Sequence, residues 1–151
     1  MTLKYKIINK KNLYSGFFNF NKYVFIHQKH DGNWTKKVER EIFEGSHVSA
    51  LLPYDPVSKE IILIQQFRAG ILSRYDDDYL YEIVAGIIDE NETPEEAAKR
   101  ECSEETGCEV NKITSIQNYF PAPGSSESYY HLYLGEVNSF HGEKIMGLES
   151  E

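Results

Sequence analysis

The stretch Gly86–Cys108 reads GIIDENETPEEAAKRECSEETGC, and it contains the clearest local structure signals in the chain. Thr93 is a favourable residue for the N-cap of a helix, and Pro94 suits the first helical position. Glu96, three residues after Thr93, can complete a capping box. Gly107 is a natural helix terminator, because glycine readily adopts the left-handed conformation found there. The segment therefore predicts one sharply delimited helix.

The predicted helix, Pro94–Thr106, carries Glu101, Glu104 and Glu105 on one face, since successive helical residues are about 100° apart. Crowded carboxylates repel one another by a few tenths of a kcal/mol per pair, and a bound divalent cation removes that penalty. Oxygen ligands suit Mg²⁺ or Mn²⁺ better than zinc. The alternative is a plain exposed acidic face, which is the more common meaning of three such glutamates taken alone.

The spacing of the whole stretch decides against that alternative. Its fixed positions are Gly86, Glu92, Arg100, Glu101, Glu104, Glu105 and Gly107. Seven set identities arise by chance on the order of 10⁻⁸ per start position at typical residue frequencies. They match the Nudix box at each fixed position, with cysteines at its two aliphatic positions, Cys102 and Cys108. The chain therefore resembles the Nudix hydrolases.

The resemblance implies a metal site and a fold. Glu101 and Glu105 would be the principal metal ligands, together with the backbone carbonyl of Ala85. Glu104 would be a further ligand or would support the others. Mg²⁺ is the expected cofactor, with Mn²⁺ as a possible substitute. The implied fold is the Nudix fold, an α/β/α sandwich with a mixed sheet.

The resemblance also assigns the catalytic groups. Arg100 would orient the glutamates by ion pairing, although a simple helical pair with Glu104 or Glu96 is the other interpretation. Glu92 would brace the loop before the helix. In the branch of the family that this chain resembles, the catalytic base lies in an acidic loop near the C-terminus, and Glu151 falls at that position. A terminal glutamate without function is the alternative.

Strands are predicted on both sides of the helix, so the class is α/β or α+β with a mixed sheet, preceded by N-terminal antiparallel strands. An Asn-rich turn is expected after the first strand. The predicted strands are Leu13–Phe20, Tyr23–His27, Lys37–Phe43, Val48–Tyr54, Glu60–Phe67, Tyr81–Ile88, Ile113–Phe120 and Tyr129–Val137. The family resemblance implies that residues 1–45 serve dimerisation and that residues 46–151 form the catalytic domain.

The segments that flank the box resemble the ADP-ribose pyrophosphatase branch of the family. They are Leu13–Phe18 (LYSGFF), Lys37–Phe43 (KVEREIF), Leu51–Pro56 (LLPYDP), Ile62–Arg68 (ILIQQFR), Tyr81–Gly86 (YEIVAG) and Phe120–Gly124 (FPAPG). This likeness implies Mg²⁺-dependent hydrolysis of ADP-ribose to AMP and ribose 5-phosphate. It also implies a homodimer whose N-terminal strands contact the partner. That branch normally continues with a further strand and a closing helix, so we expect a sequence cut short or a truncated protein.

The same likeness assigns substrate contacts at the adenosine end. Arg40 and Glu41 would contact it across the dimer. Phe17 and Phe18 would form an aromatic wall for the base, although core or dimer packing is an equal alternative for both.

Further contacts are implied at the phosphates and at the second ribose. Arg68 would reach the phosphates or the adjacent ribose, with an ordinary surface charge as the alternative. Ile87 would line the cleft. The loop that touches the second ribose would contain Ala122, Pro123 and Gly124.

Two departures from the branch leave its substrate open. Gly45 stands where an Arg is often found, and Ser128, next to Glu127, stands where a Glu is often found. A hydrolase of another nucleoside diphosphate sugar, such as GDP-mannose or ADP-glucose, is therefore an alternative. A non-catalytic Nudix-fold nucleotide-sugar sensor is another, but such domains typically lose the box glutamates that this chain retains.

Composition excludes several other classes. The chain has 151 residues and a formal net charge of −8, which disfavours binding to nucleic acid backbones. No apolar run is long enough to span a bilayer, and the polar, basic N-terminus does not resemble a secretory signal. We therefore expect no nucleic acid or membrane partner and a cytoplasmic location.

Overall fold

The structure is a computed structural model that describes residues 4–72, 79–138 and 145–146. Its contacts divide the chain into two compact units. Unit 1 contains Met1–Ser46 together with Phe120–Tyr129, and unit 2 contains His47–Tyr119 together with Tyr130–Glu151. The roles assigned from sequence to residues 1–45 and 46–151, dimerisation and catalysis, stay predictions.

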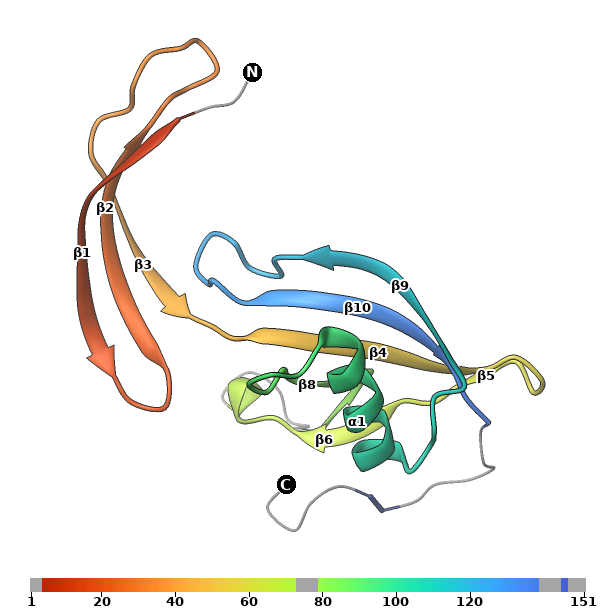
Figure 1. The fold of residues 1–151 in the computed structure, drawn as a ribbon. Helices are drawn as coiled ribbons and strands as arrows, with labels where there is room; N and C mark the ends of the chain where they lie inside the picture. Colours follow the sequence, from red (N-terminus) through yellow and green to blue (C-terminus); the bar gives the residue numbers. More distant parts are fainter. Residues whose placement is uncertain (1–3, 73–78, 139–144, 147–151) are drawn as a thin grey trace. The chain divides into compact units, whose positions relative to one another are not determined.

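Unit 1 is built on a three-stranded antiparallel sheet in the order β1-β2-β3 (Figure 1). The strands are β1 (Tyr5–Ser15), β2 (Asn19–His27) and β3 (Val38–Glu44). The single strand predicted over Leu13–Phe20 is wrong, because the chain reverses at residues 16–18, where the Gly16 N–H donates to the Phe18 carbonyl at 3.0 Å. That reversal separates β1 from β2.

The Asn-rich turn predicted after Phe20 is also wrong. Asn21 lies inside β2 and is 3% exposed. Its side-chain amide donates to Glu44 Oε2 at 3.2 Å and accepts from the Asn12 amide at 3.4 Å. Partners on the two neighbouring strands therefore satisfy a polar group that would otherwise favour a turn.

A loop from late in the sequence completes unit 1. The Phe43 N–H donates to the Ser125 carbonyl at 2.8 Å, and the Glu127 N–H donates to the Phe43 carbonyl at 3.0 Å. Within the loop, the Ala122 carbonyl accepts from the N–H groups of Ser125 and Ser126 at 3.0 and 2.9 Å. These bonds hold the loop against the end of β3.

Unit 2 contains a five-stranded mixed sheet. Its main path is β5-β4-β10-β9, and β8 pairs with β4. The strands are β4 (His47–Asp55), β5 (Glu60–Ile61), β8 (Val84–Ile87), β9 (Lys112–Tyr119) and β10 (Tyr129–Glu136). β4 and β10 are parallel, because Tyr129 donates to Ser46 and Val137 donates to Tyr54, so both strands advance together. The other pairs are antiparallel, which confirms the predicted mixed sheet.

Two predicted strands of unit 2 are each divided in the structure. The segment Glu60–Phe67 splits into β5 and β6 (Ile64–Phe67), because the Ile62 N–H turns to the Pro53 carbonyl at 3.0 Å. The segment Tyr81–Ile88 splits into β7 (Tyr79–Glu82) and β8. β7 pairs with β6 in a separate two-stranded sheet, while β8 pairs with β4. A short 3₁₀ helix, η1 (Ala69–Ile71), follows β6.

The predicted helix is confirmed at both ends. α1 (Pro94–Thr106) begins after Thr93, whose side chain accepts from the Glu96 N–H at 3.3 Å, while Glu96 Oε2 accepts from the Thr93 N–H at 2.8 Å. It ends at Gly107, which has φ of +69°. Within the described ranges α1 is the one α-helix, and it is too short to span a membrane.

α1 packs against β8 and β4 through its small residues. The buried side chains of the helix are Ala97, Ala98, Cys102 and Thr106. Ala98 and Cys102 belong to one buried cluster with the fully buried Leu51 and Val84 of the sheet. Both cysteines, Cys102 and Cys108, are buried free thiols. This packing carries the acidic face of α1 to the edge of β8.

Replacing Thr93 with alanine is expected to lower the free energy of unfolding by about 1 kcal/mol, because the substitution removes the N-cap acceptor of α1. Urea denaturation of the full chain measures the change. Thr93→Ser, which keeps the hydroxyl, is the matched control and should unfold close to the wild type. Equal stability of the alanine and serine variants would contradict the capping role.

Candidate active site

Arg100, in the middle of α1, is the centre of an ion-pair network. Its Nε and Nη2 donate to the two carboxylate oxygens of Glu92, each at 2.9 Å. Its Nη1 donates to Glu101 Oε1 at 2.6 Å and to Glu104 Oε2 at 3.3 Å, and Nη2 also reaches the Ile87 carbonyl at 3.2 Å. The planar guanidinium thereby neutralises several crowded carboxylates. Its short bonds also orient the carboxylates of Glu92 and Glu101.

The network changes the proton affinity of its members. The hydrogen bond from Arg100 holds the pKa of Glu92 below its ordinary value, and the Asp89 N–H, which also donates to Glu92, acts in the same direction. The bond to Glu92 in turn raises the pKa of Arg100, and Glu101 adds to this effect. The bidentate pair therefore stays ionised to lower pH than an isolated glutamate would.

This shift predicts a pH-dependent contribution to stability. Because the folded pKa of Glu92 is lowered from its ordinary value of 4.5, the contribution is present above that value and is lost as pH falls through the folded pKa. Urea unfolding in EDTA should therefore show wild type more stable than Glu92→Gln at neutral pH, with the difference closing as pH falls below the ordinary glutamate pKa of 4.5. If the difference in unfolding free energy between wild type and Glu92→Gln does not depend on pH, the ion pair is not the cause of that difference.

The backbone of β8 lies directly against the carboxylates of α1. A Cβ placed on Gly86 would lie 1.8 Å from Glu101 Oε1, so only glycine leaves room for that carboxylate. The Ala85 N–H donates to Glu105 Oε2 at 3.3 Å. Two carboxylates that lie four residues apart on one helix face thus converge on two consecutive residues of one strand.

This donor set fits a hard divalent cation. Carboxylate oxygens from Glu101 and Glu105, beside the backbone of Ala85, are the ligand type that Mg²⁺ takes. In the part of the chain that the structure describes, no group of three or more His, Cys, Asp or Glu side chains is arranged so that it could hold a metal ion. The Glu101 carboxylate is directed to Arg100 instead.

The two remaining predicted contacts of unit 2 lie on its strands. Arg68, just after β6, donates through Nε to Glu82 Oε2 of β7 at 2.5 Å. It is therefore a member of an ion pair and not an isolated surface charge. Ile87, at the end of β8, is 45% exposed. Contact of either residue with substrate stays a prediction.

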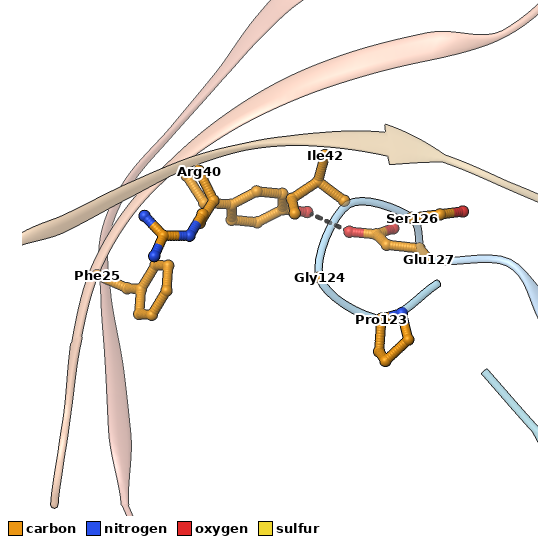
Figure 2. A pocket seen from close by; sticks show the side chains of 8 residues that line it. Phe25, Arg40, Ile42, Pro123, Gly124, Ser126 and Glu127 are labelled. Carbon is orange, nitrogen blue, oxygen red and sulfur yellow. Dashed lines mark hydrogen bonds between the residues drawn. The ribbon is translucent and has the colours of Figure 1, made fainter. Parts of the chain in front are cut away.

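Unit 1 contains a pocket of about 350 Å³ (Figure 2). It brings together three of the predicted substrate residues, Arg40, Pro123 and Gly124, whereas the neighbouring Ala122 is outside its lining. The lining residues that sequence reasoning missed are Tyr23, Phe25, Ile42, Ser126 and Glu127. Strand alternation offered a signal for Ile42, because it lies two residues after Arg40 on one strand and therefore faces the same side of the sheet.

The other predicted residues of unit 1 lie away from this pocket. Glu41 follows Arg40 on β3 and is exposed, so its side chain points to the opposite face of the sheet. Phe17 and Phe18 lie in the turn between β1 and β2. The ring of Phe18 is 4.7 Å from the rings of Phe17 and Phe43, and Phe17 is 89% exposed. Glu151, the predicted base, lies outside the described residues.

Comparison with known proteins gives a consistent result. Residues 44–151 match the family described as NUDIX domain. The ADP-ribose pyrophosphatase of Escherichia coli (strain K12) is 37% identical over 146 residues, which cover 97% of this chain and 70% of that protein. The ADP-ribose pyrophosphatase of Haemophilus influenzae is 33% identical over 149 residues, covering 97% and 69%.

A GDP-mannose pyrophosphatase of Cronobacter sakazakii is 29% identical over 139 residues, covering 91% of this chain and 72% of that protein. A solved structure of an ADP compounds hydrolase matches with a TM-score of 0.68 at 22% identity, over 95% of this chain and 75% of that one. That likeness establishes the shared fold. The complete box, the arginine-centred carboxylates at its helix and the match over residues 44–151 lead to one conclusion: the chain belongs to the Nudix family.

Proposed function

We propose that this chain hydrolyses the pyrophosphate of ADP-ribose, giving AMP and ribose 5-phosphate. The observation that carries the proposal is the 37% identity to an ADP-ribose pyrophosphatase along 97% of the chain. The carboxylate arrangement at Gly86 and Arg100 supports the same chemistry, because it assembles oxygen ligands beside an ordered backbone.

In this proposal Glu101, Glu105 and the carbonyl of Ala85 would hold Mg²⁺, with Mn²⁺ as a substitute and Glu104 as a further ligand. When bound, such ions neutralise charge on the pyrophosphate oxygens and make water a better nucleophile. Arg100 keeps Glu101 in one orientation through the 2.6 Å bond, and that orientation is in place before substrate arrives.

The reaction is the addition of water across a phosphoanhydride. The water oxygen forms a bond to one phosphorus, the bridging P–O bond breaks, and the bridging oxygen leaves on the other phosphate. One water proton must pass to a base. Glu151 is the residue we propose for that role, on the resemblance alone.

A homodimer and a cytoplasmic location belong to the same proposal. Large apolar side chains are exposed on β1 and the turn after it, including Tyr5 (71%), Ile7 (54%), Tyr14 (61%) and Phe17 (89%). A partner subunit would cover such a surface. The two buried free thiols are consistent with a reducing compartment. Sedimentation equilibrium of the full chain would report the dimer mass.

The test is incubation of the full chain with ADP-ribose and Mg²⁺, with an EDTA control, followed by chromatography for AMP and ribose 5-phosphate. Equal, cation-dependent appearance of both products is the expected result. No turnover, together with tight binding of ADP-ribose, would instead identify a non-catalytic sensor.

The second candidate is hydrolysis of another nucleoside diphosphate sugar. The 29% identity to a GDP-mannose pyrophosphatase favours GDP-mannose as the first alternative. Measuring kcat/KM for ADP-ribose, GDP-mannose and ADP-glucose under one set of conditions separates the candidates. A higher value for either of the last two would replace ADP-ribose and keep the family chemistry.

A further inference from the structure

The pocket of unit 1 combines opposite charges with aromatic walls. Arg40 and Ile42 lie on alternate positions of β3, and Tyr23 and Phe25 lie on alternate positions of the adjacent β2. Figure 2 shows Phe25 beside Arg40 and the side chain of Glu127 entering from the loop. A guanidinium, a carboxylate and two aromatic rings therefore line one space of about 350 Å³. That volume is at the lower end of small-molecule sites and suits part of a nucleotide.

Glu127 is held at two points, its carboxylate by Tyr23 and its backbone by β3. The Tyr23 hydroxyl donates to Glu127 Oε1 at 2.8 Å (Figure 2). The backbone N–H of Glu127 donates to Phe43 at 3.0 Å, which anchors the loop to β3. On the neighbouring strand β1, the Lys10 ammonium lies 5.1 Å from the centre of the Tyr23 ring and adds positive charge near the carboxylate. The acceptor oxygens of Glu127 thus have a defined place before any ligand binds.

Arg40 supplies the complementary donors. Its Nη1 donates to the Glu39 carbonyl at 2.7 Å. Among the described residues no carboxylate lies within ion-pair distance, 4.0 Å, of Arg40, so Glu127 does not neutralise it directly. The pocket therefore presents donors from Arg40 and acceptors from Glu127 as separate groups. A matching ligand is flat, with a hydrogen-bond acceptor on one part of its edge and a donor on another.

We propose that Glu127 is a specificity-determining residue that selects a purine with an amino group at its 6-position. This inference rests on the proposed function, since it concerns the base of that nucleotide substrate. The amino group donates to Glu127, a ring nitrogen accepts from Arg40, and the ring lies against the aromatic side chains. A 6-oxo purine places a carbonyl oxygen against the carboxylate and is rejected. A phosphate group is rejected as well, because it offers Glu127 only acceptors.

The first experiment measures binding, which requires no hydrolysis. Calorimetry in EDTA compares AMP with IMP, in which a carbonyl oxygen replaces the 6-amino group. The wild-type chain is expected to bind AMP about tenfold more tightly than IMP, as is usual for one well-placed polar contact to a base. Glu127→Gln should abolish or reverse this preference, because its amide can accept from Tyr23 and donate to the IMP carbonyl.

Two further variants refine the test. Tyr23→Phe frees the carboxylate without removing it, so the preference for AMP should shrink but keep its direction. Glu39→Gln, an exposed residue of β3 that pairs with Lys22, is the matched control and should leave the AMP to IMP ratio unchanged. The same ratios should appear in kcat/KM when ADP-ribose is compared with its inosine analogue.

The outcomes separate this inference from the proposed function. A wild-type chain that does not hydrolyse ADP-ribose refutes the proposed function, while the AMP and IMP affinities still decide the role of Glu127. An AMP to IMP ratio that is the same in wild type and Glu127→Gln overturns the inference. If Glu127→Gln instead changes only the ranking of ADP-ribose against ADP-glucose, the pocket holds the sugar, and the inference is again wrong.

Discussion

Glu105→Gln is expected to lower kcat for ADP-ribose hydrolysis about a thousandfold while the chain stays folded. The substitution keeps the shape of the side chain. In the wild type the Ala85 N–H donates to Glu105 Oε2 at 3.3 Å, and the amide oxygen of glutamine can still accept this bond. It removes one of the charges proposed to hold Mg²⁺. Charge stabilisation of this kind contributes several kcal/mol, and each 1.36 kcal/mol corresponds to a factor of ten in rate.

The same variant should not destabilise the fold. Glu101, Glu104 and Glu105 crowd one face of α1, so neutralising one of them relieves repulsion of a few tenths of a kcal/mol. Initial rates across a Mg²⁺ titration, together with urea denaturation, separate the two effects. Glu109→Gln, an exposed residue after the helix, is the charge-matched control and should keep its activity. Near wild-type activity of Glu105→Gln would show that the metal assignment is wrong.

Gly86→Ala is expected to reduce activity about a hundredfold with a much smaller effect on folding. The added Cβ would lie 1.8 Å from Glu101 Oε1 and 2.0 Å from its Cδ, so the carboxylate must move away. The moving atoms are the end of a flexible side chain, and the fold can therefore accommodate them. The displaced Glu101 would lose its 2.6 Å bond from Arg100 and its place beside β8.

A control of the same chemical change is available at Gly70, where an added Cβ would meet nothing within 4 Å. Gly70→Ala should keep wild-type kcat. For Gly86→Ala, circular dichroism and urea denaturation should report a folded chain within about 2 kcal/mol of wild type. If Gly86→Ala is folded and fully active, the position of Glu101 against β8 is not needed for catalysis.

Signals that act within a few residues were readable from the sequence alone. Thr93, Glu96 and Gly107 determine the ends of α1 through bonds to neighbouring backbone groups, so they predicted both boundaries correctly. The spacing of the box also placed Glu101 and Glu105 on one helix face, because helical geometry is regular. The family followed from the same residues, and the match over residues 44–151 confirms it.

The strand boundaries were less predictable, because partners elsewhere in the chain decide them. Asn21 favours a turn by itself, yet it lies in β2 because its side-chain amide forms hydrogen bonds with Glu44 and Asn12 on the neighbouring strands. The segment Glu60–Phe67 was predicted as one strand, yet it divides where the Ile62 N–H donates to the Pro53 carbonyl. Local pattern cannot distinguish one strand from two that pair with different neighbours.

By itself the sequence determined the helix, its acidic face, the box and therefore the class of chemistry, since these depend on contacts within about four residues along the chain. Only the tertiary structure decided that Gly86 of β8 makes room for Glu101 and that Arg100 organises the carboxylates around it. It alone brought Glu127 to Tyr23, about a hundred residues earlier in the sequence. The physical reason is that backbone bonds between a late loop and β3 build that pocket, and no local spacing encodes such long-range pairing.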